Sequence, residues 1–449
     1  MSSTLFPNDS VTCVAPWDNW RITSEGKVRH CWCASAQDLR FGEDPDPGAD
    51  LLTHWHTSPQ LQKVRSQIQQ GQPVGRCERC YHSTAVNGVG FKTRLFHHYA
   101  IQPGKYFRQS LEQNPVWQRM QRLEIEPNGK PAFITIAWDN QCDSRCIMCG
   151  PQFSRLVAED WQDFGFAMQN KYLNANWVAG PDGEAKYQSL LDMVVNNDRL
   201  IYLKQNGGEP MLQSQTTRFV EDIVRAGKRD FNFFINTNGT TWNQRVIDAM
   251  MTFQWNKLDF AIETMDHTND YIRFGSSIEQ IEQMIQRYRQ YDSDNFATVL
   301  HCVPQALSAW HLETLIDYCS NNNYALLANP LHGPPQHSLV VLPQDIKQQL
   351  IQHWISKYKL DLSKFQTANR IELDMNYLRS EYQQNTKSIS LNLQTILVKI
   401  IETLLLPEPT DIEQLRHKLV DHVKKFDAKH NLNFCKTFPE LADFYHKYQ

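Results

Sequence analysis

The chain has 449 residues, of which 45 are basic and 49 acidic, giving a formal net charge of -4, and 41% are hydrophobic. This is an ordinary globular composition with room for two or three domains, and the charge balance gives no reason to expect nucleic acid or an anionic membrane as a partner. The N-terminus lacks a basic region followed by an apolar run, and Gln394, Lys399 and Glu402 interrupt the most apolar stretch, residues 391–406. We therefore predict a cytoplasmic protein without a signal peptide or a membrane span.

Eleven cysteines are many for a chain in a reducing compartment, and eight of them fall within the first 149 residues. Disulfides are unlikely to persist there, so clustered cysteines point first to metal or redox sites. Residues 8–100 are rich in cysteine and tryptophan and show little periodicity, apart from a predicted helix over 59–70. We treat residues 1–100 as an N-terminal cysteine-rich domain and residues 101–130 as a linker.

From residue 131 the pattern changes to strands that alternate with helices. Strands are predicted over 133–138, 200–204, 231–236, 258–262, 296–303 and 324–329, and helices over 215–227, 243–251, 277–291 and 309–321. Repeated strand–helix alternation favours a parallel sheet with right-handed crossovers, and six units fit a partial (β/α)6 barrel better than a complete barrel of eight. We therefore predict an α/β core over residues 131–335 and a mainly helical C-terminal region over residues 336–449.

The most informative motif directly follows the first predicted strand. Cys142, Cys146 and Cys149 have the spacing C-x3-C-x2-C. Three thiolates on a cubane of four irons leave one iron without a protein ligand, free to be chelated by the amino and carboxylate groups of a small molecule. A zinc site is the alternative, but zinc would need a fourth Cys or His nearby, and none follows in the next stretch.

The segment CDSRCIMC, with Met148 before its last cysteine, resembles the signature of the radical S-adenosylmethionine (SAM) superfamily. The resemblance implies a 4Fe-4S cluster on the three cysteines and SAM as its ligand. A second family element, the GGEP motif, is matched at the end of the second strand by Gly207, Gly208, Glu209 and Pro210. Glycines allow a close backbone approach to a ligand, and backbone carbonyls together with Glu209 are expected to receive the ammonium group of SAM.

Three further strand ends carry residues that the resemblance assigns to the same pocket. Thr237 and Asn238, in Thr-Asn-Gly, are similar to a family element, although a polar turn would look the same. Glu263 stands where relatives often carry aspartate, and this departure leaves its role open. Arg273 resembles a family arginine, and either a ligand carboxylate or a structural ion pair would explain it.

The N-terminal cysteines form a second constellation. Cys13, Cys31, Cys77 and Cys80 resemble the ligand pattern of SPASM and twitch domains, which bind auxiliary 4Fe-4S clusters in radical SAM enzymes. In this chain the module precedes the core. Cys33 is an alternative ligand, and a zinc ribbon built on Cys77 and Cys80 is the alternative site.

The remaining cysteines, Cys302, Cys319 and Cys435, lie in apolar-periodic segments and are expected to be small buried residues. His301 and His332 lie near predicted strand ends and are candidates to face the cavity.

The resemblance implies that a flavodoxin- or ferredoxin-like donor reduces the first cluster. SAM is then cleaved to a 5′-deoxyadenosyl radical, which takes a hydrogen atom from the substrate, while the auxiliary cluster aids electron transfer. Family frequency favours a peptide or protein substrate, although no leader-peptide-binding domain is evident. The alternatives are oxidation of a sugar or another small molecule, a non-catalytic cluster-containing protein, and a zinc protein.

Overall fold

The computed structural model describes residues 13–31, 48–77, 80, 113–122, 124–331, 333–360 and 386–449. Its centre is an eight-stranded sheet with the order β10-β9-β7-β6-β5-β3-β1-β2. The parallel strands are β1 (Asn19–Ile22), β3 (Phe133–Ile136), β5 (Tyr202–Gln205), β6 (Asn232–Thr237), β7 (Trp255–Ala261), β9 (Phe296–Cys302) and β10 (Leu326–Ala328). The short β2 (Val28–Arg29) pairs antiparallel with β1 at one edge.

All six predicted strands are present, and helices connect them as the alternation indicated. The connecting helices include α9 (Gly183–Val195), α10 (Ser214–Arg225), α11 (Gln244–Met250), α13 (Ile278–Arg289) and α14 (Leu312–Asn322). The result is an α/β fold with a mostly parallel central sheet, consistent with a partial barrel. No helix in the described part of the chain combines the length and the hydrophobicity that crossing a membrane requires.

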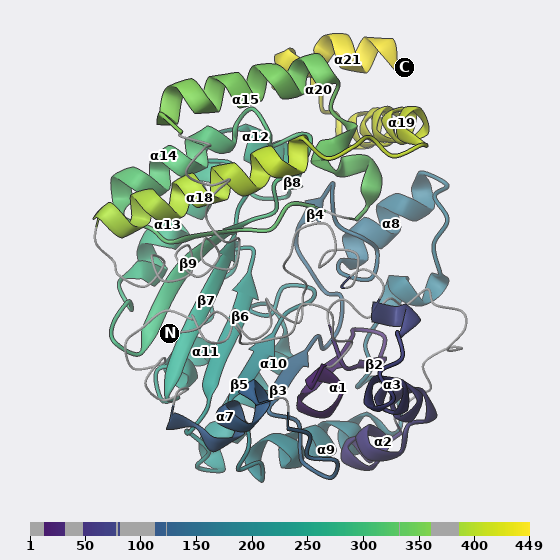
Figure 1. Cartoon of the computed structure of the whole chain (residues 1–449), viewed down its shortest axis with the longest axis vertical. Coiled ribbons are helices and arrows are strands. Elements are labelled where there is room, and N and C mark those ends of the chain that lie inside the picture. Colours follow the sequence, from purple (N-terminus) through teal and green to yellow (C-terminus); the bar gives the residue numbers. More distant parts are fainter. Residues whose placement is uncertain are drawn as a thin grey trace.

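In its described part, the C-terminal region consists mainly of helices. It comprises α15 (Gln344–Tyr358), α18 (Thr386–Leu404), α19 (Ile412–His430), α20 (Phe434–Thr437) and α21 (Ala442–Lys447). These helices gather at the upper end of Figure 1, close to the two short strands β4 (Arg145–Cys146) and β8 (Arg273–Phe274). The C-terminal region therefore covers the part of the molecule that carries the cysteine motif.

The first strand of the sheet comes from an unexpected part of the sequence. Residues of β1, within the predicted cysteine-rich domain, pair in parallel with β3 over the register Asn19↔Phe133 to Ile22↔Ile136. Next to β1, the fully buried Asp18 accepts hydrogen bonds from Arg119 at 2.6 Å and Arg199 at 2.7 Å. The described part of the N-terminal segment thus shares the central sheet with the core. Helices α1 (Ala15–Asp18), α2 (Leu51–Thr57) and α3 (Pro59–Gln69) lie beside it (Figure 1).

The two faces of the sheet differ because side chains alternate along each strand. One face packs against the helices in the main hydrophobic core, with residues such as Ile134, Leu203 and Leu258. The opposite face, called the inner face below, carries a layer of aromatic side chains. In this layer the ring centroids of Tyr202 and Phe234 are 4.4 Å apart. Helix α7 (Pro115–Gln121), in the predicted linker, covers this layer with Trp117, Val116 and Met120.

Candidate functional site

The cysteine loop and the loops after β5, β6 and β7 meet at the C-terminal edge of the sheet, because the strands are parallel and their carboxyl ends lie together. Residues of the cysteine loop form β4, which pairs antiparallel with β8. In this register Cys146 lies opposite Arg273, and Arg145 lies opposite Phe274. The pairing fixes the middle cysteine against an element that follows β7.

None of the three cysteines of the motif forms a disulfide. Cys146 is buried, whereas Cys142 and Cys149 are partly exposed. The neighbouring Cys149 thiol and the Arg273 guanidinium lower the pKa of Cys146 to about 7, whereas burial raises the pKa of Cys142. Within the described ranges, no three Cys, His, Asp or Glu side chains are grouped to hold a single metal ion. A four-iron cluster is larger and takes its thiolates at separate corners, so three thiols in one loop fit its donor chemistry.

The two glycines of the Gly-Gly-Glu-Pro loop pack tightly against the cysteine loop and the end of β3. Both have positive φ, +83° for Gly207 and +58° for Gly208. A Cβ on Gly207 would lie 2.6 Å from the Cβ of Ala137, and one on Gly208 would lie 2.4 Å from the carbonyl oxygen of Gln141. The amide of Glu209 donates to the same Gln141 oxygen at 2.7 Å. Only glycine therefore lets this loop and the cysteine loop approach each other so closely.

The carboxylate of Glu209 is buried and joins two of the predicted elements. It accepts hydrogen bonds from the Thr237 hydroxyl and the Asn238 amide, each at 2.7 Å, and from the Met211 amide at 2.9 Å. Burial outweighs these bonds and raises the pKa of Glu209 to about 7. All of these partners belong to the protein, so Glu209 holds the Thr-Asn-Gly turn in place, a role that the sequence analysis did not foresee. Pro210 is buried beside it.

Asn238 links that turn back to the cysteine loop. Its Nδ2 donates to Asp143 Oδ1 at 2.8 Å and to Ser144 Oγ at 2.9 Å, and it lies 3.8 Å from the Cys142 sulfur. Thr240 Oγ1 donates to the other oxygen of Asp143 at 2.6 Å. Asp143 and Ser144 are functional candidates that the sequence analysis missed, although they lie inside the motif as polar residues between cysteines.

Glu263 and Arg273 form a buried ion pair beside the middle cysteine. Arg273 Nη2 donates to Glu263 Oε1 at 2.6 Å, and Arg273 Nη1 lies 3.6 Å from the Cys146 sulfur. The second Glu263 oxygen accepts from the Val303 amide at 2.8 Å. The structure thus shows Arg273 in an ion pair, which is one of the two alternatives that the sequence left open for it. Its partner is Glu263, whose role the sequence also left open. Met148 is buried in the hydrophobic core beneath the loop.

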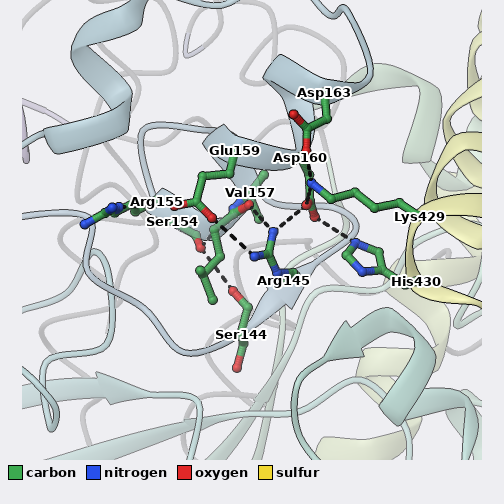
Figure 2. A network of polar contacts seen from close by, with 11 residues as sticks. Ser144, Arg145, Ser154, Arg155, Val157, Glu159, Asp160, Asp163, Lys429 and His430 are labelled. Carbon is green, nitrogen blue, oxygen red and sulfur yellow. Dashed lines mark hydrogen bonds and ion pairs between the residues drawn. The ribbon is translucent and has the colours of Figure 1, made fainter.

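A polar network anchors the cysteine loop to α8 (Arg155–Asp163) and to the C-terminal helix α19 (Figure 2). Ser154 caps α8 and donates to the Ser144 carbonyl at 3.0 Å. Arg145 is bonded to the buried Asp160, which also accepts from Lys429 at 2.7 Å and lies 3.1 Å from His430 Nε2. Sequence reasoning did not identify Asp160 because its partners are up to 270 residues away.

The N-terminal cysteines are placed only in part by the described residues. Cys13 and Cys77 both border a small hydrophobic cluster of Trp17, Val64, Ile68 and Val74. Cys31 follows β2, and Cys80 is buried. Cys33 and His332 lie outside the described residues. The structure thus brings Cys13 and Cys77 to one side of α3.

The remaining candidates are resolved by burial. Cys302 and Cys319 are fully buried core residues, as expected, and Cys435 is partly buried. His301, at the end of β9, accepts a hydrogen bond from Asn329 at 2.8 Å on the inner side of the sheet.

Comparison with known proteins identifies residues 140–319 as matching the Radical SAM superfamily. No curated protein matches the chain. Among solved structures, anSMEcpe with bound AdoMet is similar at 13% identity and a TM-score of 0.38, over 52% of this chain and 62% of that one. The chain thus spans less than two thirds of anSMEcpe. Streptococcus suis SuiB bound to S-adenosylmethionine is similar at 10% identity and a TM-score of 0.32, over 77% of this chain and 70% of that one.

Proposed function

We propose that the protein is a radical SAM enzyme, which binds a 4Fe-4S cluster on Cys142, Cys146 and Cys149 and uses it to cleave SAM. The match of residues 140–319 to the Radical SAM superfamily supports this proposal. When bound and reduced, such a cluster supplies the electron that splits SAM into methionine and a 5′-deoxyadenosyl radical, which takes a hydrogen atom from a C–H bond of the substrate. The observation that carries the proposal is the joining of the cysteine loop, the glycine loop and the Thr237–Asn238 turn through Glu209 and Asn238.

The chain's own residues prepare this site in three ways. Arg273 holds positive charge beside Cys146 and so favours its thiolate. Gly207 and Gly208 are partly exposed at the C-terminal edge of the sheet, where backbone carbonyls of their loop would accept a SAM ammonium. Glu209 fixes the turn that carries Asn238, so that the cysteine loop is held from two sides. The C-terminal helices cover this end of the molecule and would limit the access of water and oxygen to a radical.

We also propose the remaining parts of the reaction. A flavodoxin- or ferredoxin-like protein in the cytoplasm would deliver the electron. Cys13, Cys31, Cys77 and Cys80 would bind an auxiliary 4Fe-4S cluster, and the shared position of Cys13 and Cys77 beside one hydrophobic cluster supports this set. A peptide or protein is the substrate that we favour, and a sugar or another small molecule is the alternative.

The decisive experiment is anaerobic reconstitution followed by reduction and addition of SAM. The wild-type protein should form 5′-deoxyadenosine, and a Cys142→Ala/Cys146→Ala/Cys149→Ala variant should form none. Cys435→Ala, which removes a thiol outside the motif, is the matched control and should behave like the wild type. A fully loaded, reduced wild-type protein that forms no 5′-deoxyadenosine, with or without candidate substrates, would contradict the proposal.

The auxiliary cluster needs a separate measurement. Two four-iron clusters correspond to about eight iron atoms and about eight sulfides per chain. Cys77→Ala/Cys80→Ala should lower both to about four and leave the first cluster's spectroscopic signal in place. About one zinc atom per chain together with only about four iron atoms and about four sulfides in the wild-type protein would instead establish the zinc-ribbon alternative for these cysteines.

A further inference from the structure

The inner face of the sheet carries a row of charged residues directly above its aromatic layer. In the strand pairing, Arg21 is in register with Thr135, Thr135 with Lys204, Lys204 with Phe234, and Phe234 with Lys257. Residues in register on neighbouring strands point to the same side of a sheet. Three cations, from β1, β5 and β7, therefore share the inner face, on the side opposite the main hydrophobic core.

Two of these cations share one carboxylate. Asp259 forms an ion pair with each lysine. Its Oδ1 lies 2.9 Å from Lys257 Nζ, and its Oδ2 lies 3.3 Å from Lys204 Nζ. The side chains of Lys257 and Asp259 are almost completely buried, at 1% and 2% exposure, whereas that of Lys204 remains 12% exposed. The Lys257 ammonium also lies 5.0 Å from the centre of the Phe234 ring. Asp259 is thus enough to neutralise only one of the two lysines, and Lys204 is the one that still reaches solvent.

Among the described groups around Lys204, the carboxylate of Asp259 favours its positive charge, whereas Lys257 and Arg21 oppose it. Arg21 interacts electrostatically with Lys204, and around it lie Arg29, Glu25 and Cys31. His301, two residues beyond Val299 on β9, is neutral near pH 7 because burial lowers its pKa to about 4. Burial lowers the pKa of Lys204 in spite of the opposing effect of Asp259.

Polar groups without a described partner surround the same place. The hydroxyl of Thr135, between Arg21 and Lys204 in the row, is fully buried and makes no hydrogen bond in the described structure. The side-chain carbonyls of Asn206 and Asn236, at the C-terminal ends of β5 and β6, likewise receive no hydrogen bond in the described structure, and both residues are partly exposed. A purely structural network would satisfy these groups internally, since a buried polar group without a partner costs about 1–3 kcal/mol.

We propose that this row, through the partly exposed Lys204 at its middle, binds an anionic group of the substrate, a carboxylate or a phosphate. The proposal rests on the radical SAM function proposed above and adds the chemical class of the substrate. An ammonium held in a low-dielectric setting with an arginine nearby attracts an anion strongly, and the Thr135 hydroxyl is a suitable additional donor. Asp259 holds Lys257 and Lys204 in position and prevents the row from being far more positive.

The position of the row along the strands also suits a substrate. Lys204 precedes Gly207 by three residues, and a strand rises about 3.3 Å per residue, so the two lie roughly 10 Å apart along the strand axis. A molecule anchored through its anion at Lys204 would extend toward the C-terminal edge, where the glycine loop and the cysteine loop meet. A span of this size matches about three residues of an extended peptide or a small metabolite, so the anion would lie within a few residues of the reacting carbon.

The test is anion binding by the reconstituted protein without SAM. Thermal unfolding and calorimetry are recorded with sodium phosphate and with sodium acetate, each against sodium chloride at equal ionic strength. We expect saturable stabilisation of the wild type by at least one of the two anions, and the anion that binds identifies phosphate or carboxylate as the recognised group. Lys204→Met should weaken this binding at least tenfold, Lys204→Arg should restore it, and Lys418→Met, at an exposed lysine of α19, should leave it unchanged.

Two results would overturn the proposal: no saturable effect of either anion on the wild type, or equal binding by Lys204→Met and the wild type. If Lys204→Met does not fold, Lys204→Gln takes its place. Formation of 5′-deoxyadenosine is measured on the same wild-type preparation. If an anion binds but no 5′-deoxyadenosine forms, the proposed function is contradicted and the anion site stands. If 5′-deoxyadenosine forms but no anion binds, only the anion site is contradicted.

Discussion

Arg273 and Cys146 occupy paired positions on β8 and β4, and the arginine Nη1 lies 3.6 Å from the cysteine sulfur while its Nη2 donates to Glu263 at 2.6 Å. The arginine is thus held by a buried carboxylate and directed at one thiol of the motif. Groups that orient and polarise the ligands of a metal centre in this way affect it nearly as much as the ligands do.

Replacing Arg273 with methionine should therefore weaken the first cluster. We expect a loss of about 10–100-fold in 5′-deoxyadenosine formation, together with lower iron and sulfide content after reconstitution. The variant also leaves Glu263 buried without its cation, at a cost of about 3–5 kcal/mol. Arg273→Met/Glu263→Gln removes that penalty, so recovery of the melting temperature without recovery of iron content would separate the two effects. Arg245→Met, at an exposed ion pair with Glu221, is the matched control. Full iron content and activity in Arg273→Met would contradict this role.

Gly208→Ala should disrupt the contact between the glycine loop and the cysteine loop. The added Cβ would collide with the Gln141 oxygen at 2.4 Å, so one of the two loops must move. Gly71 has a similar φ of +68° with nothing within 4 Å of an added Cβ, so Gly71→Ala tests the backbone strain alone. We expect Gly71→Ala to cost about 1 kcal/mol of stability and no activity. Gly208→Ala should cost more and lower SAM cleavage at least tenfold, as measured by melting temperature and 5′-deoxyadenosine. Equal behaviour of the two variants would show that the close approach is unimportant.

Asp160→Asn should loosen the anchor between the cysteine loop and the C-terminal helix α19. The buried carboxylate receives Arg145, Lys429 and His430, and hydrogen bonds to charged groups contribute about 1.5–3 kcal/mol each when the partner is buried. Because the three partners are partly solvated, we expect a total loss of about 2–3 kcal/mol in the free energy of unfolding, measured in urea. Asp421→Asn removes an exposed pair with Lys425 on the same helix and should change stability by less than about 0.5 kcal/mol.

Stability should decline at alkaline pH through His311. Burial opposes its positive charge, but hydrogen bonds with Asp266 at 2.8 Å and Glu440 at 3.2 Å outweigh burial and raise the pKa of His311 to about 9. A folded-state pKa above the unfolded value of about 6.5 stabilises the protein fully below pH 6.5, and this contribution disappears as the pH rises through 9. Its size is on the order of 1 kcal/mol after allowance for solvent screening.

The measurement is the melting temperature at pH 6 and at pH 9.5 for the wild type and His311→Gln. The wild type should lose more stability between these values than the variant does. Asp266 acts in the acid range. Burial raises its pKa, but its hydrogen bonds outweigh burial and lower the pKa to about 2. Asp266 therefore stabilises the protein above its unfolded pKa of about 3.8, and this contribution is lost as the pH falls through 2. Parallel pH profiles of the wild type and the variant would contradict the assignment to His311.

The sequence by itself determined the repeating part of the fold and the identity of the motif. Alternation of apolar runs with amphipathic segments is a local property, so the six strands from residue 133 onward and the helices between them could be predicted from it. The spacing of Cys142, Cys146 and Cys149 is likewise written in one short segment, as is the Gly-Gly-Glu-Pro loop. Because parallel strands end at one edge, their convergence followed from the topology.

Only the tertiary structure decided what these residues contact. Strand β1 has only four residues and a weak local pattern. It pairs with β3, more than a hundred residues away in the sequence, and this pairing brings Arg21 onto the inner face. Glu209 was expected to face a ligand, yet its oxygens bind Thr237 and Asn238, because the folded chain brings these donors to a buried carboxylate. Lys204 and Lys257 lie on different strands, more than fifty residues apart in the sequence, and only the folded structure brings both to Asp259. Sequence spacing specifies which groups are available, whereas long-range packing decides which of them meet.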